Sequence, residues 1–176
     1  MIPIASLRNK YAGRPGAVLG GGPSLQADLK RVPSETVWIA VNHHGLKYGP
    51  ADYTVFLDDT PSLRITLGEL RKRGGVLVSR QAESDVDLGG SDWWQARFSG
   101  QLACWLACWL GCDPVILCGM NLYRNPPPTV EEVKNLAYQA PLEEHLKGWR
   151  EAFTKCVHPE RIRAASGPLV GVFGKL

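Results

Sequence analysis

The chain has 176 residues, of which 44% are hydrophobic, and it carries a formal net charge of +3 at pH 7. This length suits one α/β domain over residues 1–176, with a core several strands wide. The mild, scattered positive charge does not favour nucleic acid as a partner, and no apolar stretch reaches the roughly 18 residues that span a bilayer. No N-terminal segment resembles a secretion signal, so we expect a cytoplasmic protein. The sequence leaves subunit association open.

Short apolar runs alternate with amphipathic stretches along the chain. The predicted strands cover residues 17–21, 37–41, 54–58, 76–79, 115–119 and 161–165. The predicted helices cover residues 25–31, 61–73, 99–111 and 142–156. This alternation is typical of a Rossmann-like domain, in which a mainly parallel sheet is covered by helices on both faces. Two long connections, 80–98 and 122–141, are interpreted as lids over a ligand crevice, because long loops in compact domains usually carry function.

The first predicted strand runs into a turn rich in glycine. Its residues are Gly20, Gly21, Gly22, Pro23, Ser24 and Leu25. Glycines let backbone N–H groups approach a phosphate, and the helix start that follows adds partial positive charge. Ser24 is interpreted as a helix N-cap or a phosphate donor, and a side chain at position 22 is expected to fill the space of the anion. The turn therefore predicts a nucleotide ligand, with an ordinary strand–helix turn as the alternative.

Two better-known phosphate motifs do not fit this turn. Leu25 stands where the dinucleotide fingerprint has its third glycine, and Asn42 follows the second strand where an NAD site has Asp or Glu. No Lys-Ser/Thr pair follows the glycines, which excludes a Walker P-loop.

Polar residues also follow the second and third predicted strands. Asn42 and His43 lie at the carboxyl end of strand 37–41, on the side where open α/β sheets bind ligands. His43 and His44 are alternative general bases, and they point to different faces if the strand continues. Asp58 ends the third strand and is a candidate ligand for Mg²⁺ on a diphosphate. No cofactor is otherwise predicted.

Three of the five cysteines, Cys104, Cys108 and Cys112, are spaced four apart in the helix predicted over 99–111. Eight helical residues separate the outer two by about 12 Å. Two thiolates on one zinc ion allow only about 10 Å between their Cα atoms. We therefore predict buried structural thiols and no metal site.

Several short segments, taken in chain order, resemble one known group of proteins. They are Gly22-Pro23-Ser24-Leu25, Asn42, Ser99-Gly100, Leu110-Gly111, Gly119-Met120-Asn121 and Ser166-Gly167. This order is similar to that of the bacterial family 42 sialyltransferases and of the related archaeal 6-hydroxymethylpterin pyrophosphokinase-like proteins. The resemblance implies a nucleotide-dependent transferase, similar to a glycosyltransferase that uses a CMP-type nucleotide-sugar donor. The acceptor is not indicated.

The resemblance also implies roles for particular residues. Gly22, Ser24, Asn42 and Ser99 would contact the nucleotide, and Gly100, Gly119, Asn121 and Ser166 are placed in the same site. Tyr123 would stabilise the departing phosphate. His145 would act as the general base, with an exposed helix histidine as the alternative.

Asn121 stands where the family has Asp, so two other functions stay open. One is ATP-dependent, pyrophosphokinase-like transfer, which needs Mg²⁺ across the phosphates. The other is a non-catalytic protein that binds or sequesters a nucleotide.

Overall fold

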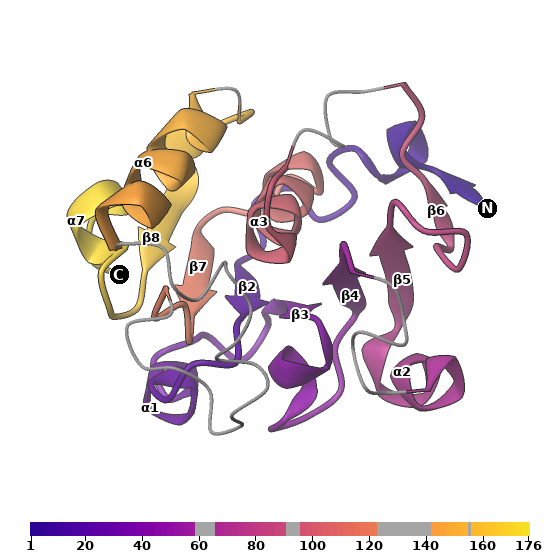
Figure 1. The fold of residues 1–176 in the computed structure, drawn as a ribbon, viewed down its shortest axis with the longest axis horizontal. Coiled ribbons are helices and arrows are strands. Elements are labelled where there is room, and N and C mark those ends of the chain that lie inside the picture. Colours follow the sequence, from indigo (N-terminus) through magenta and orange to yellow (C-terminus); the bar gives the residue numbers. More distant parts are fainter. Residues whose placement is uncertain (59–65, 91–95, 123–141, 155) are drawn as a thin grey trace.

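The computed structural model describes residues 1–58, 66–90, 96–122, 142–154 and 156–176. Six parallel strands form one sheet in the order β5-β4-β3-β2-β7-β8 (Figure 1). They are β2 (Gly16–Leu19), β3 (Val37–Val41), β4 (Tyr53–Phe56), β5 (Val76–Ser79), β7 (Val115–Cys118) and β8 (Ile162–Ala164). The predicted α/β fold with a parallel sheet is confirmed, and each strand ends within two residues of its predicted bounds.

Helices lie on both faces of this sheet (Figure 1). The longer ones, α3 (Ser99–Trp109) and α6 (Leu142–Phe153), cover one face, and α1 (Leu25–Leu29) and α2 (Leu67–Gly74) cover the other. Successive strand residues point to opposite faces, so Val18 packs in the core that contains α3 whereas Ala17 and Leu19 pack against Leu25. Burial on both faces explains why the strands read as nearly continuous apolar runs. None of the described helices has the length and apolar character needed to cross a membrane.

Within the described residues the chain also forms several shorter elements. They are β1 (Ile2–Pro3), β6 (Val86–Asp87), α7 (Val170–Phe173) and three 3₁₀ helices, η1 (Ile4–Leu7), η2 (His43–Leu46) and η4 (Pro159–Arg161).

The order of the strands reverses beside β2. β2, β3, β4 and β5 follow one another along the sheet, and the chain then returns through α3 to place β7 on the other side of β2. Leu19 of β2 is in register with Ala40 of β3 and with Cys118 of β7. Open α/β sheets bind ligands outside the carboxyl ends of their strands at such a reversal. Here that place lies beyond Leu19 and Cys118.

The start of α2 differs from the prediction. Thr66 is extended, with ψ of 149°, and is the N-cap: its hydroxyl accepts from Glu69 N, and the Glu69 carboxylate accepts from Thr66 N. This reciprocal capping box begins the helix at Leu67. A continuous helix over 61–73 is therefore wrong, and residues 59–65 lie outside the described part of the chain.

Part of the connection 80–98, which was interpreted as a lid, packs along the edge of the sheet. β6 pairs in parallel with β1, and neither was predicted because two-residue strands show no periodicity. Just before β6, the Asp85 carboxylate accepts from Leu77 N and the Ser84 hydroxyl accepts from Ser79 N. These bonds cover the outer edge of β5, which would otherwise expose unpaired N–H groups. Residues 91–95 lie outside the described ranges.

Candidate nucleotide site

The glycine turn after β2 lies directly against the segment after β7. Gly20 N donates to Cys118 O at 2.8 Å, and Gly22 N donates to Gly119 O at 2.9 Å. A Cβ added to Gly20 would lie 2.5 Å from Gly119 O, and one added to Gly22 would overlap Asn121 Oδ1. The chain's own close approach therefore requires these glycines. A side chain at position 22 was expected to fill the space of an anion, but it would first meet Asn121 and Gly119 of the chain itself.

Two backbone N–H groups of the turn point to no acceptor within the described chain. The N–H of Gly22 is bonded to Gly119, and that of Leu25 donates to Gly22 O at 3.1 Å. Pro23 has no N–H to offer. The N–H groups of Gly21 and Ser24 have no hydrogen-bond partner among the described residues, and Gly21 is exposed. They are the donors that the turn can offer to an anion.

A buried carboxylate lies behind the turn. Asp28 is 3% exposed, and its Oδ2 accepts hydrogen bonds from Ser24 Oγ, Gly119 N and Ser166 Oγ, each at 2.9 Å. Ser24 therefore occupies the N-cap position of α1 without capping it, because its side chain is turned toward Asp28. The sequence analysis missed Asp28, since one acidic residue in a short helix usually faces solvent. In the structure it joins the segments that follow β2, β7 and β8.

Asn42 lies beside the turn, directly after β3. Its backbone has φ of +52°, and its N–H donates to Val55 O at 2.9 Å. Its side-chain Oδ1 is buried and has no hydrogen-bond partner among the described residues. An unpaired buried acceptor costs free energy, so this atom is a point where a ligand N–H or O–H would be stabilised.

The two histidines after Asn42 lie together. The strand ends at Val41 and the chain turns into η2, so the rings of His43 and His44 lie 3.9 Å apart between centroids, tilted by 40°. They do not point to different faces. A Cβ on Gly21 would lie 2.5 Å from His44 Cβ, which places His44 against the glycine turn.

The amino end of α3 reaches the same edge of the sheet. Ser99 Oγ accepts from Leu57 N at 3.0 Å, which ties the helix to the end of β4. Asp58, the next residue, is exposed. One lone pair of the Ser99 hydroxyl is therefore used within the chain, and Asp58 lies on the surface just after β4.

Two apolar side chains that the sequence analysis did not single out line this region. A Cβ on Gly100 would lie 3.4 Å from both Met120 Cε and Trp149 Cζ2, and a Cβ on Gly20 would lie 3.0 Å from Met120 Sδ. Met120 therefore sits between the glycine turn and α3, with Trp149 of α6 beside it. The approach of Met120 and Trp149 to the same glycine depends on how α6 packs against the sheet, so the sequence alone does not indicate it.

His145 lies one helical turn before Trp149 and is buried. It is 3% exposed, and its ring centroid is 5.6 Å from that of Phe98. The alternative of an exposed histidine is wrong. Gln101 holds α6 in place by donating to Gly148 O at 3.2 Å. Tyr123, the predicted phosphate partner, and the rest of the predicted lid up to residue 141 lie outside the described residues.

The three cysteines of the predicted helix are core residues, as predicted, whereas Cys156 is half-buried. Cys104, Cys108, Cys112 and Cys118 are buried free thiols. Burial raises the pKa of Cys112 and of Cys118 to about 12. Across the described ranges, no group of three or more His, Cys, Asp or Glu side chains is placed to hold a metal ion.

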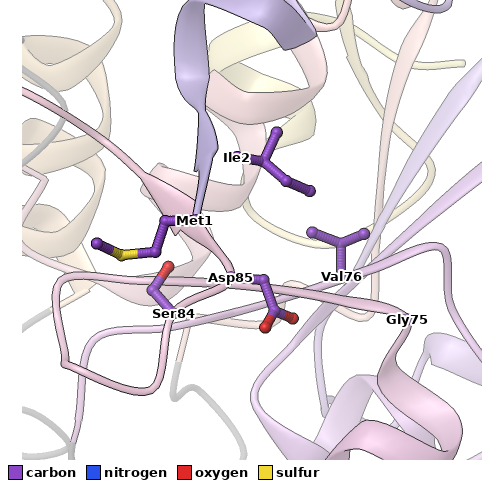
Figure 2. A pocket seen from close by; sticks show the side chains of 6 residues that line it. All are labelled: Met1, Ile2, Gly75, Val76, Ser84 and Asp85. Atoms are coloured by element: carbon purple, nitrogen blue, oxygen red, sulfur yellow. The ribbon is translucent and has the colours of Figure 1, made fainter.

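The pocket in Figure 2 lies at a different place. It has a volume of about 480 Å³ and is lined by Met1, Ile2, Gly75, Val76, Ser84 and Asp85. Gly75 and Val76 mark the amino end of β5, whereas ligands of open α/β sheets bind at the carboxyl ends. We assign this pocket no part in nucleotide binding.

The chain was also compared with known proteins. No family model matches it, and the comparisons with curated proteins and with solved structures found no match.

Proposed function

We propose that this chain is a nucleotide-dependent transferase, similar to a glycosyltransferase, that binds a CMP-type nucleotide-sugar donor beside its glycine turn. The observation that carries the proposal is that the N–H groups of Gly21 and Ser24 and the buried Asn42 Oδ1 have no hydrogen-bond partner among the described residues. All three residues follow the carboxyl ends of β2 and β3, where the strand order reverses. The N–H groups suit a phosphate, and the amide oxygen suits a hydroxyl or amino group of the nucleoside. The resemblance of these segments to the sialyltransferases supports the same choice of ligand.

The reaction would break the bond between the sugar's anomeric carbon and the phosphate oxygen, and form a bond to an acceptor hydroxyl. The nucleotide leaves with the electron pair, and charge that develops on its phosphate is stabilised by backbone N–H groups. Tyr123 is proposed to donate to that phosphate. His145 is proposed to take the acceptor's proton. Because it is 3% exposed and a base must come within hydrogen-bond distance of the proton, this role requires its surroundings to open.

Burial of His145 also favours a second candidate, a protein that binds or sequesters a nucleotide without turnover. A pyrophosphokinase-like reaction with ATP and Mg²⁺ is the third, and Asp58 is its candidate metal ligand.

A matched pair of variants tests the binding site. Asn42 has φ of +52° and Asn9 has φ of +57°, so glycine fits the backbone at both positions. Asn42→Gly removes the buried Oδ1 that follows β3, whereas exposed Asn9 follows η1, and its N–H donates to Trp109 O at the other end of α3. We expect Asn42→Gly to weaken CMP binding by about 3- to 12-fold, the loss of one hydrogen bond, and Asn9→Gly to leave it unchanged. Calorimetric titration with CMP, ATP and a CMP-sugar is the measurement, and equal affinities in all three proteins would place the nucleotide elsewhere.

Turnover separates the transferase from the binder. Hydrolysis of a CMP-sugar should fall about 10²–10⁴-fold in His145→Ala and about 10²–10³-fold in Tyr123→Phe, with CMP affinity nearly unchanged. A parent protein that binds the CMP-sugar without hydrolysing or transferring it would favour the binder.

A further inference from the structure

Asp28 accepts the hydroxyl hydrogens of two residues at the proposed site. Its Oδ2 lies 2.9 Å from Ser24 Oγ and 2.9 Å from Ser166 Oγ. A serine hydroxyl has one hydrogen and two lone pairs, so each hydroxyl that donates to Asp28 can only accept from a ligand. Ser24 Oγ also lies 3.0 Å from Asn121 Oδ1. A carboxylate is the stronger acceptor of the two, so the hydrogen stays with Asp28.

The same carboxylate oxygen fixes the glycine turn. It accepts from Gly119 N at 2.9 Å, and Gly119 O in turn accepts from Gly22 N at 2.9 Å. The position of the turn thus depends on Asp28 through Gly119. Because Asp28 is 3% exposed, solvent does not compete for these bonds.

The negative charge of Asp28 also lies close to Ser24, whose N–H has no hydrogen-bond partner among the described residues. Ser24 Oγ lies 2.9 Å from Asp28 Oδ2, so a phosphate oxygen bonded to the N–H of the same residue would lie near this carboxylate. Like charges that lie near each other repel, and in the part of the chain that the structure describes Asp28 forms no salt bridge. The carboxylate therefore weakens the binding of a bare phosphate.

We infer that Asp28 is a positioning residue that presents Ser24 and Ser166 as hydrogen-bond acceptors, so that the crevice recognises donor groups of the nucleoside more strongly than its phosphates. The inference rests on the proposed function and names the nucleoside as the part of the nucleotide that the site recognises. The hydroxyl and amino groups of the sugar and base are donors of the required kind. Ser24 is accordingly an acceptor from the nucleoside and not the phosphate donor that the sequence suggested.

Two probes separate these contacts: CMP, which has a nucleoside, and inorganic pyrophosphate, which has none. Ser24→Ala and Ser166→Ala should each weaken CMP binding by about 3- to 12-fold, one hydrogen bond, and leave pyrophosphate affinity within about twofold. Asp28→Asn keeps an acceptor of the same shape but removes the charge, so it should tighten pyrophosphate binding by about tenfold. A merely structural role of Asp28 would instead weaken both probes together. Pyrophosphate is measured by competition against CMP.

Thr54→Val is the matched control. The Thr54 hydroxyl donates to Gly74 O at 2.9 Å in a buried site away from the crevice, so its loss should lower stability and leave both affinities unchanged. Three results would each overturn the inference. The serine variants could weaken the binding of both probes equally, or weaken the binding of neither. The Asp28→Asn protein could bind pyrophosphate no better than the parent. In all three cases CMP binding by the parent keeps the proposed function standing. A parent that binds neither CMP, ATP nor a CMP-sugar would overturn the proposed function and this inference with it.

Discussion

Replacing Gly22 with alanine tests how closely the glycine turn is held against the β7 segment. The new Cβ would overlap Asn121 Oδ1 and lie 2.6 Å from Gly119 O. The Asn121 side chain is half-buried and can rotate, but Gly119 O is held by its bond from Gly22 N. Moving the two segments apart costs that hydrogen bond, about 1 kcal/mol, and overpacking adds about 1–3 kcal/mol. Alanine also reduces the conformational freedom of the unfolded chain, which stabilises the folded state by about 0.4–1 kcal/mol.

The free energy of unfolding should therefore fall by about 1–3 kcal/mol in Gly22→Ala. Urea unfolding followed by tryptophan fluorescence measures it. Gly68→Ala is the control, because a Cβ at Gly68 in α2 meets nothing within 4 Å. Alanine in a helix should be neutral or stabilise by up to about 1 kcal/mol. If Gly22→Ala is as stable as Gly68→Ala, the close approach described for the turn is wrong.

Two further predictions concern titrating groups. Burial raises the pKa of Cys118 to about 12 from about 9, so the unfolded thiol ionises first and stability should be lost as pH rises from 9 toward 12. In Cys118→Val this loss should be smaller than in the parent when urea unfolding is compared at pH 8 and pH 10, and equal losses would contradict the assignment. Hydrogen bonds from the Thr66 side chain and backbone lower the pKa of Glu69. Thr66→Val should raise that pKa toward its ordinary value in an NMR titration and lower the unfolding midpoint, whereas an unchanged pKa would show that the capping box does not form in solution.

Local patterns predicted most of the sheet because its strands are buried on both faces. β3 and β5 were predicted to the residue, as short apolar runs bounded by polar or glycine-rich segments. The start of α2 was missed although a local signal existed, because Thr66 and Glu69 have the spacing of a capping box.

The sequence by itself determined which residues follow the strands, and therefore that Gly20, Asn42 and Gly119 would gather at one edge of a parallel sheet. It did so because local hydrophobicity marks where each strand ends, and parallel strands place their carboxyl ends at the same edge of the sheet. Only the tertiary structure decided the role of Asp28, whose partners Gly119 and Ser166 are 91 and 138 residues away along the chain. The burial of His145 against Phe98 was decided in the same way. Contacts between such distant segments leave no periodic trace in the sequence, because they depend on how the finished layers pack.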